Sequence, residues 1–150
     1  MIVESSMHGF VATVREDGTP NLSPKGSVRV YDDEHLVFVD TASPQTVRNI
    51  ETNPNVEVNC VDFLRRRGYL FKGTAEIREP GDPVYEWIRE WLLETHGPKV
   101  PAHHAVLIEV REVRPLLSPA YLFLDASEPE LVRGWVETYG IEAHVASAGV

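Results

Sequence analysis

The hydrophobic residues of this chain alternate mostly with polar ones, which is the two-residue period of a half-buried β-strand. The alternation predicts six strands: Phe10–Arg15, Asn21–Val30, Leu36–Asp40, Val56–Asp62, Tyr69–Ile77 and Ala105–Val113. Short polar turns join the first strands, which indicates antiparallel neighbours. The second strand is interrupted by "SPKG", residues 23–26, although Pro and Gly both weaken a strand. This interruption needs an explanation.

Three segments change to the helical period, and each has end signals. A Ser-Pro start and an Asn-Pro stop bound a helix in residues 43–54. An Asp-Pro start and a Gly-Pro stop bound another in residues 82–98, whose aromatic stripe we expect to pack in the core. Ser127 and Glu130 form the capping box of a last helix, in residues 127–140.

The order of these elements argues against a parallel doubly wound sheet, because strands and helices do not alternate regularly. The sequence therefore predicts a mainly β (α+β) fold, a small closed or partly open barrel with peripheral helices. The length of 150 residues is typical of one domain. We expect a single domain over residues 1–150, with a core in residues 7–113 and a C-terminal helical extension in residues 114–150.

The net charge of −9, from 14 Lys and Arg against 23 Asp and Glu, argues against nonspecific binding to nucleic acid or an anionic membrane. The sequence has no 18-residue apolar run, and its start lacks a basic region, so we expect no membrane segment and a cytoplasmic location. The single cysteine, Cys60, lies in an apolar run, which predicts a buried core thiol rather than a reactive one.

No catalytic constellation or metal site is predicted from the sequence. His96, His103 and His104 match no known zinc spacing, and no Ser-His-Asp order or paired catalytic carboxylates stand out. The best candidate anion site is the helix start at residues 43–48, where free backbone N–H groups and a positive dipole end would suit a phosphate monoester. The alternative is an ordinary Ser-Pro helix start with a solvated arginine.

Three stretches, taken in order, resemble the pyridoxamine 5′-phosphate oxidase-like family of flavin-binding split barrels. They are "VATVREDGTPNLSPKG", "LVFVDTASPQTVRNIETNPNVEV" and "GYLFKGTAEI". The resemblance is good over residues 7–77 and weaker to residue 113. It implies a six-stranded antiparallel Greek-key split β-barrel with about three peripheral helices. It also implies FMN as cofactor and a homodimer with flavin sites at its interface.

The resemblance offers a role for the interrupted strand, which in this family borders the isoalloxazine ring. Lys25 would place positive charge at the pyrimidine edge, which stabilises the anionic reduced flavin. The alternative is a surface lysine that protects an edge strand. This chain departs from the true pyridoxamine 5′-phosphate oxidases, which carry an Arg-Lys pair where it has Gln45-Thr46. The implied cofactor-binding residues are Ser23, Pro24, Lys25, Gly26 and Ser27 along the strand, Asp40 and Thr41 beside the ring, and Ser43, Gln45, Thr46 and Arg48 at the phosphate.

The basic run "RRRG", which begins at Arg65, has two interpretations. It is a solvated hairpin turn, or Arg66 and Arg67 reach across the dimer interface to the cofactor. The function implied is an FMN-dependent oxidoreductase that uses a reduced nicotinamide or another small redox partner. A deazaflavin-dependent reductase on the same fold, and a non-catalytic flavin or haem carrier or sensor, remain alternatives.

Overall fold

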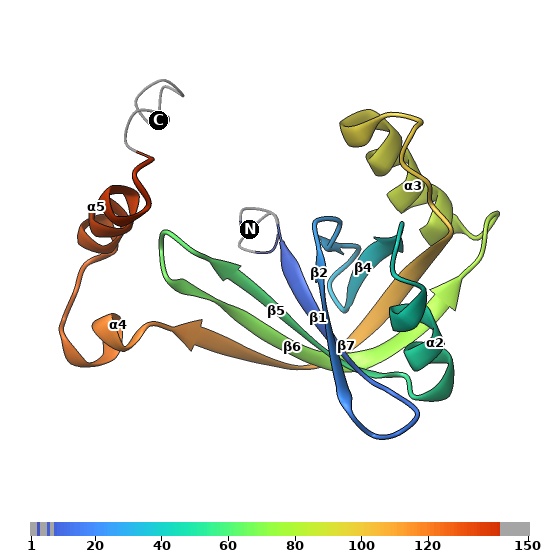
Figure 1. Cartoon of the computed structure of the whole chain (residues 1–150), viewed down its shortest axis with the longest axis horizontal. Helices are drawn as coiled ribbons and strands as arrows, with labels where there is room; N and C mark the ends of the chain where they lie inside the picture. Colours follow the sequence, from blue (N-terminus) through green and yellow to red (C-terminus); the bar gives the residue numbers. More distant parts are fainter. Residues whose placement is uncertain (1–2, 4–5, 7, 142–150) are drawn as a thin grey trace.

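A computed structural model of the chain describes residues 3, 6 and 8–141, and it is built on one antiparallel sheet of seven strands (Figure 1). The strands are β1 (Gly9–Val14), β2 (Pro20–Lys25), β3 (Arg29–Val30), β4 (His35–Asp40), β5 (Asn55–Asp62), β6 (Arg67–Arg78) and β7 (His104–Leu117). The helices are α2 (Pro44–Thr52), α3 (Pro83–His96), α4 (Pro119–Phe123) and α5 (Glu128–Tyr139). The sheet order is β2-β1-β5-β6-β7-β4-β3.

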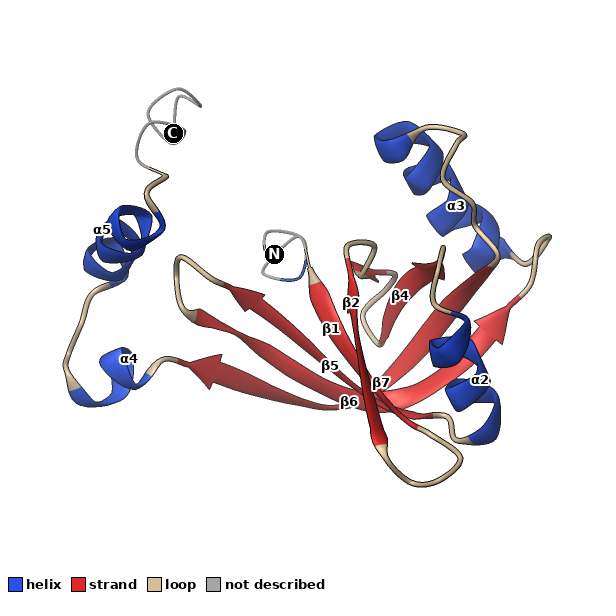
Figure 2. Ribbon diagram, in the orientation of Figure 1, coloured by secondary structure: helices blue, strands red, loops and turns tan. Residues whose placement is uncertain are grey.

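The predicted second strand is two strands that lie at opposite edges of the sheet. β2 pairs only with β1, and β3 pairs only with β4. Because three residues, 26–28, connect the two edges, the sheet must curl until its edges approach each other (Figure 2). The mainly β, barrel-like prediction is confirmed, with seven strands instead of six. Pro24 is tolerated because β2 is an edge strand with one free side.

The last two strands of the chain, β6 and β7, form a long arm. They pair from Arg78 and Ala105 at the body to Arg67 and Leu117 at the far end. Beyond residue 108 no residue of β7 is buried. The sequence predicted that this strand ends at Val113, but it continues to Leu117 and leads into α4, a helix that was not predicted. Figure 1 shows α4 and α5 at the outer end of this arm, away from α2 and α3.

The core lies on both faces of β4, the strand next to the edge strand β3. Leu36 and Phe38 point into the curl and join one apolar cluster there. Val37 and Val39 point to the other face and pack against α3. Five of the six β4 residues are buried as a result, so β4 is fixed from both sides. Cys60 is fully buried inside the curl, as predicted, and burial raises the pKa of its thiol to about 11.

Helix α3 begins and ends at the residues that the sequence indicated. The Asp82 carboxylate accepts the N–H of Val84, at 2.8 Å, and Gly97 ends the helix with a φ of 76°. The prediction that its whole aromatic stripe packs in the core is wrong for Trp87, which is 41% exposed. Trp91 instead lies under the Arg29 guanidinium, whose carbon is 3.9 Å from the ring centroid. The outer side of α3 therefore keeps exposed aromatic surface.

Candidate functional site

The connection between β2 and β3 is the centre of the candidate site. Ser27 fixes this connection to β4, because its hydroxyl oxygen accepts the Val39 N–H at 3.1 Å and lies 3.4 Å from the Val39 carbonyl. Lys25 ends β2, and Gly26 is the exposed residue at which the chain leaves that strand. The predicted residues 23–27 therefore cross from one sheet edge to the other next to the end of β4.

Lys25 is buried, with 6% of its surface exposed, so the alternative of a surface edge-strand lysine is wrong. Its ammonium donates a hydrogen bond to the Ser43 hydroxyl and lies 5.5 Å from the centroid of the Phe38 ring. Burial lowers the pKa of Lys25, and the nearby Asp40 charge opposes this effect. A buried ammonium with few partners is a costly feature, which makes Lys25 a functional candidate.

Asp40 is the second buried charged residue of the site and is 4% exposed. One carboxylate oxygen accepts the N–H of Ser43 at 3.0 Å, and the other lies 3.5 Å from Nδ1 of His104. Nε2 of His104 lies 3.6 Å from a carboxylate oxygen of Glu79, which is exposed. A line of polar groups thus runs from Lys25 through Asp40 to His104 and the surface.

The start of α2 lies directly beside these residues. Ser43 is the N-cap by position, but its side chain makes no cap hydrogen bond, because it accepts from Lys25. Thr46 is 1% exposed, so its hydroxyl is buried. Gln45 is partly exposed, donates to the Asn49 side chain at 2.7 Å and accepts from Arg48 at 2.9 Å. Of the four predicted phosphate residues, Gln45 and Arg48 present polar groups at the surface.

Two cavities flank Ser43. The smaller one has a volume of about 180 Å³ and is lined by Lys25, Gly26, Ser27, Thr41, Ser43 and the end of α3 at Leu92 and His96. The larger one has a volume of about 450 Å³ and is lined by Asp40, Ser43, Arg48, His103 and His104, among others. The site residues predicted between Lys25 and Arg48 therefore gather around two adjoining hollows, apart from the buried Thr46 and from Gln45, which lines a separate hollow with Arg15, Glu16 and Asp17. Ligand pockets usually measure about 300–1,000 Å³, so the smaller cavity alone is not a full flavin site.

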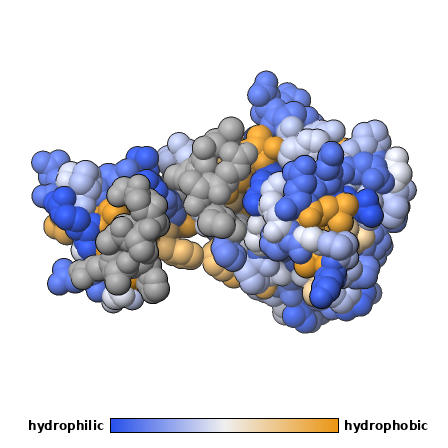
Figure 3. Space-filling model, turned by 90° about the horizontal axis from the view of Figure 1, so that it is seen from above, coloured by the Kyte–Doolittle hydropathy of each residue, from blue (hydrophilic) through white to orange (hydrophobic). Residues whose placement is uncertain are grey.

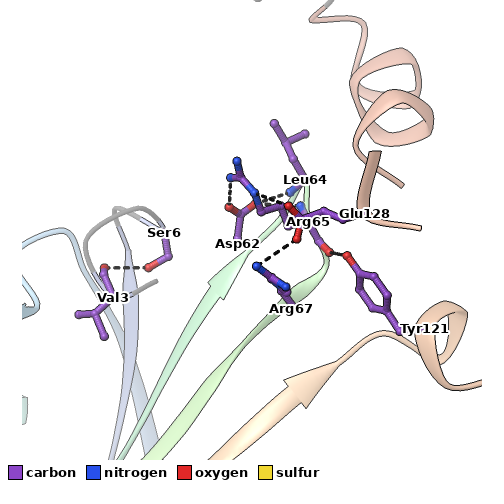
Figure 4. Close-up of polar contacts among 8 residues, drawn as sticks. All are labelled: Val3, Ser6, Asp62, Leu64, Arg65, Arg67, Tyr121 and Glu128. Carbon is purple, nitrogen blue, oxygen red and sulfur yellow. Dashed lines mark hydrogen bonds and ion pairs between the residues drawn. The ribbon is translucent and has the colours of Figure 1, made fainter. Parts of the chain in front are cut away.

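Arg66 and Arg67 lie elsewhere, at the tip of the β5–β6 hairpin, where Figure 4 shows Arg67. Arg67 forms an ion pair with Glu128 at 3.1 Å, and the Arg66 guanidinium carbon lies 4.0 Å from the centroid of the Trp135 ring. Arg65 binds both Asp62, at 2.7 Å, and Glu128, at 3.2 Å. Within one chain, the structure does not bring this basic run to the other predicted site residues.

Sequence reasoning missed His96 and His104 as members of the site. His104 faces Asp40 because the two residues are partners in the β4–β7 register. His96 lines the smaller cavity from the last turn of α3, and its Nδ1 lies 2.7 Å from the Thr95 hydroxyl oxygen. Both positions depend on contacts between segments far apart in the sequence, and no local pattern encodes them.

The chain matches the family model of the pyridoxamine 5′-phosphate oxidase over residues 2–117. It is 32% identical over 114 residues to the uncharacterized protein MJ0282 of Methanocaldococcus jannaschii, covering 73% of this chain and 72% of that protein. The chain therefore belongs to the pyridoxamine 5′-phosphate oxidase family, as the sequence resemblance predicted. The matched segment ends where β7 ends, before α4.

Three solved structures share this fold. HupZ of Group A Streptococcus is 32% identical, with a TM-score of 0.67 over 77% of this chain and 92% of that one. An F420 reductase is 27% identical, with a TM-score of 0.60 over 75% of this chain and 93% of that one. An FMN-binding protein from Syntrophomonas wolfei is 10% identical, with a TM-score of 0.68 over 76% and 80%, and shares the fold alone. Within the described residues, no helix is long and apolar enough to cross a membrane.

Proposed function

We propose that the protein is an FMN-binding flavoprotein that acts as an oxidoreductase with a reduced nicotinamide or another small redox partner. The observation that carries this proposal is the buried Lys25 ammonium, which lines a cavity directly beside the start of α2. A flavin mononucleotide needs both features, a positive charge at the electron-rich ring edge and an anion site for the phosphate. Family membership and the FMN-binding neighbour support the choice of cofactor.

FMN, when bound, supplies the hydride and electron transfer, and the protein supplies position and electrostatics. Lys25 would lie at the pyrimidine edge and favour the negative charge of the reduced ring. Ser43 and Asp40 would hold Lys25 in place, since the Ser43 hydroxyl accepts from its ammonium and the Asp40 charge favours its protonated form. Gly26 and Thr41 line the same cavity and would border the ring.

A second subunit would complete the site. The cavity around Lys25 measures about 180 Å³, which is below the usual size of a ligand pocket. A homodimer with a flavin at each end of its interface would enlarge each cavity and exclude water from the ring. In this arrangement the hairpin that carries Arg66 and Arg67 would come from the partner chain.

The phosphate would lie at the first turn of α2, beside Arg48 and the positive end of the helix dipole. A charge substituted at Gln45 tests this position, because Gln45 is partly exposed and accepts a hydrogen bond from Arg48. Thr46 is less suitable, since a charged residue would be buried there. We expect wild type to prefer FMN over riboflavin by about 2–4 kcal/mol, from one or two charge-assisted bonds of roughly 1.5–3 kcal/mol each plus the helix dipole.

The experiment titrates apoprotein with FMN and with riboflavin in wild type, Gln45→Glu and Gln45→Lys. The two variants differ in the sign of one charge at a partly exposed position. The preference for FMN should fall in Gln45→Glu and rise in Gln45→Lys, each by about 1.5–3 kcal/mol, because the changed charge meets the phosphate. Equal affinity for the two flavins, or indifference to both substitutions, would place the phosphate elsewhere or exclude flavin as the ligand.

A deazaflavin is the second candidate cofactor, since the chain is 27% identical to an F420 reductase over most of that protein. Lys25 would act on its ring in the same way. Titration with F420 beside FMN separates the two, and tighter binding of F420 would assign the protein to the deazaflavin-dependent reductases.

A further inference from the structure

Two charged side chains lie buried close to each other below a polar surface. In the view of Figure 3, hydrophilic residues cover most of the body of the molecule. Lys25 and Asp40 lie below the surface instead, since they are only 6% and 4% exposed. Buried charges are rare in proteins unless each has a partner that satisfies it. The partners of these two charges therefore decide which electrostatic field a molecule bound beside Lys25 would meet.

The two oxygens of the Asp40 carboxylate have different partners. Oδ1 accepts the N–H of Ser43 at 3.0 Å, and the Ser43 hydroxyl accepts a hydrogen bond from the Lys25 ammonium. Oδ2 faces Nδ1 of His104 at 3.5 Å. A carboxylate only accepts hydrogen bonds, so the His104 tautomer that fits carries its hydrogen on Nδ1. Asp40 is thus shared between the Lys25 side of the site and His104.

The fold fixes His104 opposite Asp40. The two residues are partners in the register of β4 and β7, and the backbone N–H of His103 donates to the Asp40 carbonyl at 2.9 Å. Nε2 of His104 lies 3.6 Å from a carboxylate oxygen of the exposed Glu79. The His104 ring also borders the cavity of about 450 Å³. The remaining charged or titratable groups on this cavity are Arg48, Glu51 and His103.

Loss of the His104 ring would take away the partner of Oδ2 in Asp40. The buried carboxylate would then turn toward the nearby Lys25 ammonium, whose charged form it already favours. A closer pair of opposite charges interacts more strongly, so the carboxylate would neutralise more of the ammonium charge. Less of that charge would remain for a ring bound beside Lys25.

We propose that His104 is a positioning residue of the cofactor site, which holds the Asp40 carboxylate away from Lys25 and so leaves the ammonium charge available to the bound ring. This inference rests on the proposed FMN site beside Lys25. His104 does not line the cavity that contains Lys25, so it acts through Asp40 rather than on the flavin. Reduced FMN carries a negative charge on its ring, so this arrangement favours the reduced cofactor.

The first experiment compares the reduction potential of bound FMN in wild type, His104→Leu and His104→Asn. Leucine removes the Nδ1 donor, while the asparagine amide donates from nearly the same place. We expect the affinity for reduced FMN, relative to oxidised FMN, to fall at least about tenfold in His104→Leu, because a hydrogen bond to a charged group is lost. A tenfold change lowers the two-electron potential by about 30 mV. His104→Asn should restore most of the wild-type potential.

The matched control removes another histidine that faces an aspartate. Nδ1 of His35 lies 2.7 Å from a carboxylate oxygen of Asp32, in the turn before β4. His35 lines neither of the two cavities that flank Ser43. His35→Leu should therefore leave the flavin potential unchanged. A potential that falls equally in His35→Leu and His104→Leu would overturn the role of His104.

The second experiment uses the apoprotein and needs no flavin. The chain has three lysines, so NMR titration of isotope-labelled lysines resolves Lys25 from Lys72 and Lys99. Burial lowers the pKa of Lys25 in wild type, and a carboxylate that turns toward the amine opposes this effect. The proton affinity of Lys25 should therefore rise at least about tenfold in His104→Leu. It should stay near the wild-type value in His104→Asn.

The two experiments separate failure of this role from failure of the cofactor site. Wild type that binds no FMN would overturn both together. Normal FMN binding with an unchanged Lys25 titration in His104→Leu would overturn the role of His104 alone. His104→Gln decides the matter if the leucine variant does not fold, because its amide reaches the place of Nε2 and not of Nδ1. His104→Gln should then behave differently from His104→Asn, and equal Lys25 titrations in these two variants would overturn the proposal.

Discussion

Replacing Lys25 with methionine is the sharpest test of the buried charge in this fold. Methionine has nearly the same length and shape as the lysine stem, so the substitution removes the charge without opening a cavity. Lys25 is 6% exposed and reaches the Ser43 hydroxyl and the neighbourhood of Asp40. The variant therefore isolates the energetics of one buried ammonium.

Two opposing contributions decide the stability of Lys25→Met at neutral pH. The charge-assisted hydrogen bond to Ser43, worth about 1.5–3 kcal/mol, is lost. The desolvation of a buried ammonium, which costs roughly several kcal/mol, is relieved. Asp40 keeps the Ser43 N–H at 3.0 Å and His104 at 3.5 Å, so it is not left without partners. We expect the free energy of unfolding at pH 7 to change by less than about 2 kcal/mol.

The pH dependence has a definite sign. Burial lowers the pKa of Lys25 in the folded chain below the value of 10.5 expected for an exposed lysine. Between these two pKa values the unfolded chain binds more protons, so the contribution of Lys25 to stability rises with pH. The Cys60 thiol has its pKa raised from 9.0 to about 11 in the folded chain, so its contribution to stability falls as the pH rises above 9. Cys60 is present in both proteins, so its effect cancels in the difference between them.

The assay is urea unfolding followed by tryptophan fluorescence at pH 7, 8.5 and 10. The free energy of unfolding of wild type should rise with pH relative to that of Lys25→Met. Lys72→Met is the control, because the Lys72 side chain is 45% exposed and pairs with Glu57 at 3.6 Å on the surface. A difference between wild type and Lys25→Met that does not change with pH would refute the burial of a charged Lys25.

Two further predictions concern the packing around the sheet. Gly73→Ala should lower the free energy of unfolding by about 3 kcal/mol or more, because the new Cβ would lie 2.1 Å from the Glu109 carbonyl oxygen. The control Gly134→Ala, with open space around it on α5, should be neutral or stabilising by up to about 1 kcal/mol. Equal effects of the two substitutions on urea unfolding would contradict the register of β6 and β7. The Cys60 thiol, buried and with a pKa raised to about 11, should resist a thiol reagent at pH 8 until the chain unfolds, and rapid modification of the native protein would show that the interior of the curl is open.

The features that local sequence determines were predicted well. Alternation located strands such as β1 and β5, because one face of each is more deeply buried than the other. The Asp82-Pro83 start and the Gly97 stop of α3 were read directly from capping chemistry. The same Ser-Pro signal as at the start of α2 stands at Ser118-Pro119, and it could have indicated α4.

The features that depend on long-range contacts were not predictable from the sequence. The interrupted pattern from Asn21 to Val30 cannot reveal that its two halves pair at opposite sheet edges. The buried Lys25 ammonium contacts the Ser43 hydroxyl, 18 residues away in the sequence. His104 contacts the Asp40 carboxylate, 64 residues away. The family resemblance predicted which residues should gather there, but only the fold places Thr46 beneath the surface.

The absorbance spectrum of the purified protein, followed by the mass of any released chromophore, tests the central claim most directly. We predict the two-band absorption of an oxidised flavin and a released mass equal to that of FMN, restored in apoprotein by added FMN. A released mass equal to that of F420 or of haem, or an apoprotein that takes up no flavin, would contradict the proposal that FMN binds beside Lys25 and the start of α2.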